Sequence, residues 1–366
     1  MAEQVQNQTR TVDAAWQVRA FAPGDEGGIA CLFAGVFGRS LSVARYRWKV
    51  LEAPWSIGAD TAWVAAAGGD IVGHYAGTPL RFKLGERELT ILHVGDVMTA
   101  AHARRQGVLS AVGSAATRAW AAAGVPFLIG VPQPTMGSRR EYLGWQKVFE
   151  AAWWFSPLHP ESLLASRYPN HSVLLRVSAV AGRVWNGLWE ACLGRAGRGT
   201  TVASVERVGP EFDALWAGLR QHYEALVVRD RAWLTYRYAQ APGQEYRILL
   251  AKRDGQPVGY LVYRLTEGEG RRTGWMVNLM TAPHDWAARA ALLGTARRAL
   301  WEAGAGKMLA LIPRGSGLER RMGTAGFSRT AGSYDVSVVL AADAELHPAL
   351  RDPTRWFVMA GDFDVV

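Results

Sequence analysis

The chain has 366 residues, 49% of them hydrophobic and 20% charged, which fits a folded protein of two ordinary domains and excludes wholesale disorder. Only two cysteines, Cys31 and Cys192, argue against a disulfide-rich secreted scaffold and favour a reducing cytoplasm. The polar start has no apolar signal region, and no apolar run reaches the roughly 18 residues of a membrane-spanning helix. We therefore expect a soluble cytoplasmic protein.

The net charge of +9 favours an anionic partner. A coenzyme that carries phosphates would satisfy this preference, and so would RNA. The basic residues are spread along the chain, with small clusters at Arg104-Arg105, Arg139-Arg140, Arg271-Arg272 and Arg320-Arg321. Composition alone does not choose between the two kinds of partner.

The first hundred residues predict a strand and two helices, followed by consecutive antiparallel strands. The segments are a strand at 16–21, helices at about 28–37 and 46–55, and strands at 61–67, 70–81 and 89–99. Gly68-Gly69 is a strong hairpin signal between two of these strands, and Gly85-Glu86 makes the next tight turn.

A basic, glycine-containing turn follows the last of these strands. Arg104-Arg105-Gln106-Gly107 precedes Val108, where an apolar helical period begins and continues until Gly124. A helix N-terminus presents free backbone N–H groups and a partial positive charge. Glycine lets a ligand approach the backbone closely. The simplest interpretation is a pocket for a diphosphate.

The chain continues with a short apolar strand at 126–131, a loop, a short helix and a returning strand. Between residues 161 and 199, Arg176, Arg183 and Glu190 recur every seven residues while valines and leucines fall elsewhere. This pattern predicts an amphipathic helix, which packs between domains or, as an alternative, lies on a membrane surface. The glycine-rich stretch at 194–200 reads as a linker.

The second half of the sequence repeats the order of the first. AKRDGQPVGYLVYR, from residue 251, echoes the hairpin around Gly68-Gly69, and VNLMTA, from residue 277, echoes VGDVMTA, from residue 94. KMLALIPR echoes PFLIGVPQ, and RRMGTAGFSRT echoes EYLGWQKV. Because the echoes occur in order and at similar spacing, we interpret the chain as two copies of one domain.

The turn at Arg104 resembles motif A of the GCN5-related N-acetyltransferases (GNATs), whose diphosphate loop reads Q/R-x-x-G-x-G/A. Arg104 and Gly107 fit this spacing, whereas Leu109 stands where the family has glycine or alanine. The strand before the turn and the helix after it add to the resemblance. With the internal repeat, the resemblance to a tandem pair of such domains covers most of the chain.

The resemblance implies an α/β fold in which each tandem domain has a central, mostly antiparallel sheet flanked by helices. We expect an N-terminal domain at 1–160 with the acyl-coenzyme A site, a connecting helix and linker at 161–200, and a C-terminal domain at 201–366. The second copy has no glycine at the loop position and one arginine, Arg289, well into its helix. We therefore expect the second copy to be degenerate and to bind no coenzyme.

In this family the pantetheine arm of the coenzyme lies along the fourth strand. Carried over by position, the backbone of Val97 and Thr99 would pair with it, and Gln133 after the fifth strand would contact coenzyme or substrate. The expected coenzyme-binding residues are Val97, Met98, Thr99, Arg104, Arg105, Gln106, Gly107, Val108, Leu109, Ser110 and Gln133. Acetyl-coenzyme A or another acyl-coenzyme A would be the co-substrate, and no metal site is expected.

Acyl transfer to an amine needs a base that takes a proton from the ammonium. Asp96 lies just before the pantetheine segment and is the first candidate; His74 and His93 are alternatives, each with a purely structural role as the competing interpretation. The terminal segment WFVMAGDFDVV could return as a strand and bring Asp362 and Asp364 to bind the amine.

The departing thiolate needs a proton. The family often uses a tyrosine four residues before a Gly-aromatic pair, but here Tyr142 lies only two before Gly144-Trp145, and Arg140 holds the usual place. Tyr142 is the nearest phenol and the candidate acid, with a packing role or protonation by water as the alternatives.

The leading hypothesis is an acyl-coenzyme A-dependent N-acyltransferase, with an acetyl or short acyl group passed to an amine such as an amino sugar or natural-product intermediate. An aminoacyl-tRNA-dependent transferase on the same fold is a second hypothesis, which the basic charge would suit. A binding protein with a decayed site is a third. The acceptor, the acyl length and the oligomeric state stay open.

Overall fold

The computed structural model describes residues 16–132, 136, 139–165, 167–268, 270–340 and 348–363. The chain divides into two compact units. The first comprises Met1–Glu52, Ile57–Thr78 and Val94–Gly124, and the second comprises Ala53–Ser56, Pro79–His93 and Val125–Val366. The boundaries expected at residues 160 and 200 remain a prediction.

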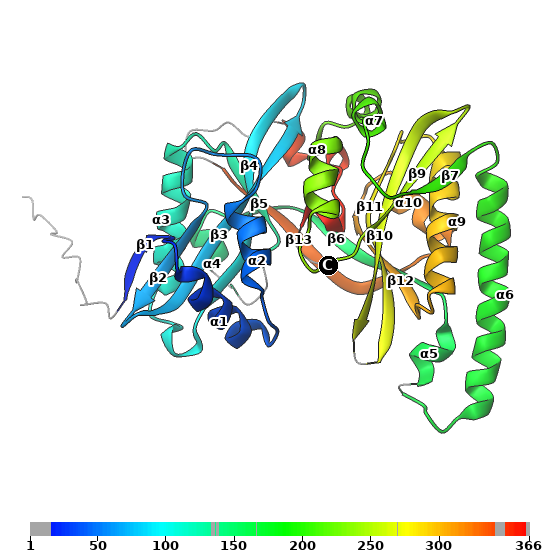
Figure 1. The fold of residues 1–366 in the computed structure, drawn as a ribbon, viewed down its shortest axis with the longest axis horizontal. Helices are drawn as coiled ribbons and strands as arrows, with labels where there is room; N and C mark the ends of the chain where they lie inside the picture. The colour runs from blue at the N-terminus through cyan, green and yellow to red at the C-terminus, as the bar shows by residue number, and fades with distance from the viewer. Residues whose placement is uncertain are drawn as a thin grey trace, which may run out of the picture. The chain divides into compact units, whose positions relative to one another are not determined.

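The first unit is a small sheet with helices on both faces (Figure 1). Its strands are β1 (Gln17–Ala20), β2 (Ala62–Ala67), the first part of β3 (Asp70–Leu84) and the last part of β4 (Arg87–Thr99). Its helices are α1 (Asp25–Phe37), α2 (Val43–Tyr46), η1 (Arg47–Leu51), η2 (Ala101–Ala103) and α3 (Val108–Ala122). The strands β1 and β3 each pair antiparallel with β2.

Alternation along the strands of the first unit decides what each face packs against. Ala62 and Val64 of β2 join one core cluster with α1, α2 and η1. On the other face, a Cβ atom at Gly73 would lie 2.5 Å from Cγ1 of Val108. Only glycine at position 73 lets the first turn of α3 pack this close to β3, so the strand fixes where α3 begins.

The second unit contains a long mixed sheet. Its further strands are β5 (Phe127–Gly130), β6 (Gln146–Pro157), β7 (Thr201–Val205), β8 (Ala225–Val227), β9 (Arg247–Arg253), β10 (Gln256–Gly268), β11 (Arg271–Thr281), β12 (Lys307–Pro313) and β13 (Ser328–Leu340). The strands follow the order β3-β4-β5-β13-β6-β12-β11-β10-β9-β7, with β8 paired to the end of β3. The last strand, β13, therefore lies between β5 and β6, so both halves of the sequence build one sheet here.

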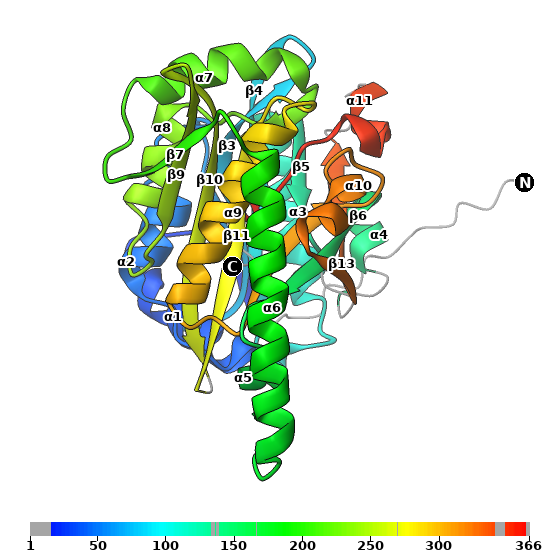
Figure 2. The same ribbon diagram turned by 90° about the vertical axis from the view of Figure 1, so that its right-hand side faces the viewer.

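The helices of the second unit cover this sheet. They are α4 (Arg139–Tyr142), α5 (Pro160–Ala165), α6 (Ser172–Ala196), α7 (Glu211–Leu219), η4 (Arg220–His222), α8 (Arg231–Leu234), η5 (Thr235–Ala239), α9 (Trp286–Glu302), α10 (Glu319–Met322), η6 (Gly323–Ala325), α11 (Pro348–Arg351), η7 (Pro353–Arg355) and η8 (Ala360–Asp362). Leu293, Ala296 and Leu300 bring α9 into the main core cluster. Figure 2 shows α9 between the sheet and α6.

The repeat predicted from the sequence has a counterpart in the order of elements. The series β2-β3-β4-α3-β5-α4-β6 is followed by β9-β10-β11-α9-β12-α10-β13. A second parallel was missed: α2 runs into the π-helical turn η1, as α8 runs into η5, and Ser42 and Asp230 cap α2 and α8 in the same way. The mixed α/β fold with flanking helices is thus confirmed.

The helix predicted between residues 161 and 199 forms as α6, but its apolar stripe points outward. Val177 is 61% exposed and Leu188 59% exposed, whereas Gly182 and Leu193 on the opposite face are buried. The helix contacts α9, where Asn186 accepts a hydrogen bond from Arg297, while the valines of the stripe stay more than half exposed. No helix in the part of the chain that the structure describes is long and apolar enough to cross a lipid bilayer.

The prediction of a returning C-terminal strand is wrong for the residues described up to Phe363. Trp356 makes only an isolated bridge to Ala225, and the segment then forms the 3-10 turn η8. The reason is local: Asp362 accepts a hydrogen bond from the backbone N–H of Met359, which closes a tight turn. Asp364 lies outside the described residues.

Candidate functional site

The basic turn lies where the sequence predicted it, in the first unit between β4 and α3. Arg104, Arg105, Gln106 and Gly107 are all exposed, whereas Val108 is buried against the sheet. Arg105 has φ 65° and Gly107 has φ 84°, so two left-handed residues turn the chain just before the helix. Consecutive turns of this kind aim backbone N–H groups into one concavity, which suits an anion.

The N-terminus of α3 is open to a ligand. Its N-cap is Gly107, and no side chain caps the helix. A Cβ atom built at Gly107 would meet nothing within 4 Å, so the protein itself leaves the space beside this residue empty. The nearby polar side chains are held elsewhere: Nε of Arg104 donates to the carbonyl of Thr99, and Nε2 of Gln106 donates to that of His102. The turn therefore keeps free the N–H groups that would hold a diphosphate.

The strand before the turn contains an unsatisfied polar group. Met98 is buried in the core of the first unit, while Val97 and Thr99 on either side are partly exposed. The hydroxyl Oγ1 of Thr99 is buried and has no hydrogen-bond partner among the described residues. A buried hydroxyl without a partner is uncommon and costs free energy, so it fits a strand edge that a ligand completes.

Asp96 lies in a buried ion pair that the sequence did not reveal. Its carboxylate Oδ2 is 2.5 Å from Nζ of Lys49, on η1, and the two side chains are 12% and 8% exposed. Asp96 also has φ 49°, a left-handed conformation inside strand β4. This conformation is uncommon for a residue other than glycine, and such strained residues cluster at active sites and ligand-binding positions.

His74 is held by two hydrogen bonds, one of them to the backbone of Asp96, and serves a structural role. It is 1% exposed, its Nδ1 is 2.7 Å from the backbone carbonyl of Asp96, and its Nε2 is 3.1 Å from the hydroxyl of Tyr46. Since a carbonyl only accepts, Nδ1 carries the hydrogen and Nε2 accepts from Tyr46. Both nitrogens are engaged, so the neutral ring is not free to act as a base.

Burial lowers the pKa of His74 below its usual 6.5, although the nearby carbonyl and carboxylate of Asp96 act in the opposite direction. In the unfolded chain the imidazole of His74 therefore binds a proton near pH 6.5, whereas in the folded chain it stays neutral at that pH. As a result, the free energy of unfolding falls as the pH drops below about 6.5. We expect a loss of up to about 1.4 kcal/mol per pH unit from this group. The free energy of unfolding is measured by denaturant titration at several acidic pH values. His74→Gln should make it depend less steeply on pH, whereas substitution of the exposed His102 by glutamine should leave the pH dependence unchanged. The same pH dependence in the wild type and in both variants would contradict the structural role assigned to His74.

The remaining predicted site residues lie in the second unit or outside the described residues. Tyr142 is 70% exposed on the short helix α4. His93 is buried with its ring against Phe363. Asp362 is fully buried in an ion pair with Arg229, and burial raises its pKa more than Arg229 lowers it.

Gln133 lies outside the described residues. Over the part of the chain that the structure describes, no group of His, Cys, Asp or Glu side chains could hold a metal ion.

The second half closes the helix terminus that the first half leaves open. The carboxylate of Asp285 caps α9 by accepting from the backbone N–H of Ala288 at 3.0 Å. Burial alone would raise the pKa of Asp285, but its bonds to Arg253 and Ala288 outweigh burial and lower it. A fixed carboxylate thus occupies the position where an anion would bind, and it would repel a phosphate.

The second half also lacks a counterpart of the ion pair between Lys49 and Asp96. Arg237 on η5, Tyr260 on β10 and Asn278 on β11 come from the elements that correspond to those of Lys49, His74 and Asp96. Nδ2 of Asn278 donates to the hydroxyl of Tyr238 at 2.9 Å. A neutral amide cannot accept a proton as a carboxylate does, so this cluster lacks the group that Asp96 supplies.

Comparison with known proteins identifies the type of domain in the first part of the chain. Residues 17–148 match the model of the acetyltransferase (GNAT) domain. No curated protein matches the chain.

Solved structures share the fold over most of the chain. A probable N-acyltransferase of unknown function from Enterococcus faecalis V583 is 13% identical, with 90% of this chain and 74% of that chain covered and a TM-score of 0.61. A GCN5-related N-acetyltransferase from Anabaena variabilis is 11% identical, with 89% and 73% covered and a TM-score of 0.61. N-myristoyltransferase from Saccharomyces cerevisiae, solved with bound myristoyl-coenzyme A, is 8% identical, with 94% and 90% covered and a TM-score of 0.63. At these identities the likeness shows the fold.

Proposed function

We propose that this chain, whose residues 17–148 match the acetyltransferase (GNAT) domain, transfers an acyl group from acyl-coenzyme A to an amine. The observation that carries the proposal is the open N-terminus of α3 behind two left-handed residues, Arg105 and Gly107. The corresponding helix α9 is capped by its own carboxylate. We therefore propose that the chain has one coenzyme site, which lies in the first unit.

The turn would hold the diphosphate of the coenzyme. Backbone N–H groups from Gly107 to Ser110 would donate to its oxygens, and the partial positive charge of α3 would favour its negative charge. The exposed guanidinium groups of Arg104 and Arg105 would add attraction at the rim. Leu109 takes part only through its backbone, which is why a side chain at this position is compatible with the site.

The strand before the turn would hold the pantetheine arm. Main-chain groups of Val97 and Thr99 would pair with its amides as a neighbouring strand does. The buried hydroxyl of Thr99 would gain the partner that it lacks among the described residues. In this arrangement the thioester would lie near the left-handed residue Asp96.

Acyl transfer forms one bond and breaks one. The amine nitrogen attacks the thioester carbonyl carbon, the C–S bond breaks, and the thiolate leaves as a free thiol once it is protonated. We propose that Asp96 accepts the proton of the incoming ammonium, directly or through a water, and that Lys49 holds the carboxylate in position. Tyr142 is the proposed proton donor to the thiolate, and its large exposure allows water to replace it.

The amine acceptor and the length of the acyl chain can be determined by a screen. Acetyl-, short-chain and myristoyl-coenzyme A are incubated with amino sugars and other small amines, and the released thiol is detected. Amine-dependent thiol release that disappears in an Arg104→Ala/Gly107→Glu variant supports the proposal. Tight binding of aminoacyl-tRNA without coenzyme binding would support the tRNA-dependent alternative, and binding of neither would leave a scaffold protein. A cytoplasmic site of action and an amino sugar or natural-product acceptor belong to the same proposal.

A further inference from the structure

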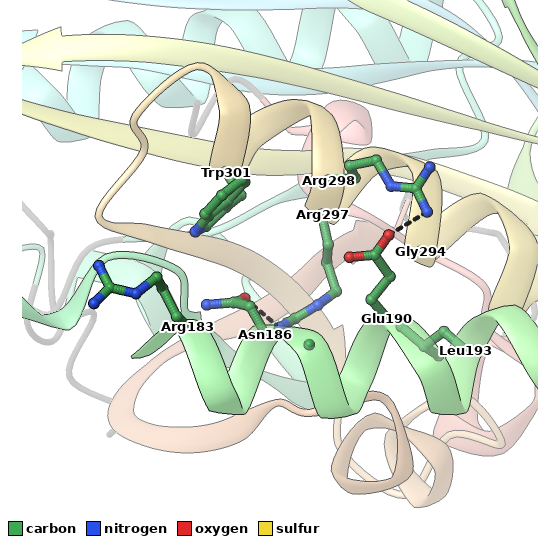
Figure 3. A pocket seen from close by; sticks show the side chains of 9 residues that line it. Arg183, Asn186, Glu190, Leu193, Gly294, Arg297, Arg298 and Trp301 are labelled. Atoms are coloured by element: carbon green, nitrogen blue, oxygen red, sulfur yellow. Dashed lines mark hydrogen bonds and ion pairs between the residues drawn. The ribbon is translucent and has the colours of Figure 1, made fainter. Parts of the chain in front are cut away.

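A cavity lies in the second unit, between α6 and α9 (Figure 3). Its volume is about 190 Å³, well above the roughly 10–15 Å³ that one water needs. The cavity is lined by Arg183, Asn186, Gly187, Glu190 and Leu193 of α6 and by Gly294, Arg297, Arg298 and Trp301 of α9. None of these residues belongs to the turn before α3, so the cavity is distinct from the proposed coenzyme site.

The charges that line the cavity do not balance. Three arginines face a single carboxylate, and that carboxylate, Glu190, is paired with Arg298. Figure 3 shows this pair beside a second contact, between Arg297 and Asn186. For Arg183, no ion pair is found in the described part of the chain. Arg183 is exposed to solvent, so Arg297 is the positive charge that is buried at the cavity without a carboxylate.

Arg297 is the more informative of the two. It is only 4% exposed, and its guanidinium donates to the hydroxyl of Ser156 and to the amide oxygen of Asn186, both neutral groups. Burial lowers the pKa of Arg297 to about 10, so the group is still charged near neutral pH. A buried cation without a carboxylate partner destabilises a folded protein unless another anion completes the site.

Gly187 supplies an independent indication. It lies in the middle of the 25-residue helix α6, where glycine is less favourable than alanine. A Cβ atom at this position would meet nothing within 4 Å, so packing within the protein does not require glycine. Its absent side chain instead leaves room in the cavity.

The opposite wall is a fixed aromatic ring. The imidazole of His159 stacks on the indole of Trp301, with ring centroids 5.4 Å apart and planes 8° apart, and Nε2 of His159 lies 2.9 Å from the carbonyl of Trp301. A rigid indole suits a flat apolar body, and guanidinium groups suit a carboxylate or phosphate. We propose that this cavity binds a small organic anion in which a carboxylate or phosphate is attached to a planar apolar group.

The test uses the full chain with benzoate and phenyl phosphate as probes, and with benzyl alcohol and sodium chloride of equal ionic strength as controls. Thermal unfolding and calorimetric titration are measured. We expect at least one probe to raise the melting temperature in a saturable manner, and neither control to do so. Comparison of the two probes distinguishes carboxylate from phosphate.

Three variants make the result specific. Arg297→Met should weaken probe binding by at least about tenfold, because it removes the buried charge. Gly187→Leu should abolish binding by filling the cavity without lowering the ligand-free melting temperature, which keeps the test valid should Arg297→Met not fold. Arg355→Met, an exposed arginine outside the cavity, should bind as the wild type does. The proposal is overturned if neither probe binds, if salt reproduces the shift, or if Gly187→Leu binds normally.

Discussion

Replacing Gly107 with alanine is expected to weaken acetyl-coenzyme A binding by at least about tenfold, which corresponds to roughly 1.4 kcal/mol. The residue has φ 84°, and a Cβ atom there would point into the space left open beside the N-terminus of α3. That space is where the diphosphate is proposed to lie, so the methyl group and the strained backbone both act against the ligand. Isothermal titration of the purified full chain gives the dissociation constant directly.

Gly124, just beyond the other end of α3, provides the matched control. It has φ 82°, is also exposed, and a Cβ atom at this position would likewise meet nothing within 4 Å. Both alanine variants should lose about 1–2 kcal/mol of folding stability from the left-handed conformation. Only Gly107→Ala should lose coenzyme affinity. Equal affinities for the two variants would place the diphosphate elsewhere.

Replacing Asp96 with asparagine is expected to destabilise the first unit by about 3–5 kcal/mol, because it leaves the ammonium of Lys49 buried without its carboxylate. Turnover should fall by a factor of about 10²–10⁴, the usual contribution of a proton-transferring group. Denaturant unfolding and thiol-release kinetics measure the two effects separately. In a Lys49→Met/Asp96→Asn variant, part of the stability should return while turnover stays low.

Asp25 offers the comparison for this prediction. It also forms an ion pair in the first unit, with Arg19, but Arg19 is 42% exposed and stays hydrated when its partner is removed. Asp25→Asn should therefore cost much less stability and leave turnover unchanged. If Asp96→Asn retained full turnover after correction for the unfolded fraction, Asp96 would be a structural residue only.

Local patterns predicted most elements of the fold. The hairpin at Gly68-Gly69, the strand that ends at Thr99 and the helix that begins at Val108 all depend on neighbouring residues, and the structure places each within a few positions of the expected bounds. The internal repeat was visible for the same reason, because each echo is a short segment with its own turn and period.

Long-range pairing was not visible in the sequence. The strand β13 lies between β5 and β6, and nothing in the residues 328–340 specifies that partner over another. The ion pair of Lys49 with Asp96 joins residues far apart in the chain, and only the π-helical turn η1 brings the lysine to β4. A valine-rich stripe on α6 predicted a packed face, whereas the packed face is built from glycine, asparagine and leucine.

The site was predicted in part. The turn from Arg104 to Ser110 could be found because a helix start and a left-handed glycine leave a local signal. The uncapped state of α3 and the capping of α9 by Asp285 could not be distinguished from sequence spacing, since both depend on where a side chain points. That difference supports the proposal, first drawn from the missing glycine of the second copy, that only one half binds the coenzyme.

Hydrogen–deuterium exchange with and without acetyl-coenzyme A tests this assignment most directly. We predict that the coenzyme protects the backbone amides of residues 104–110 and leaves the amides at the start of α9, near Asp285, unchanged. Protection at the start of α9 with none at 104–110 would contradict the account.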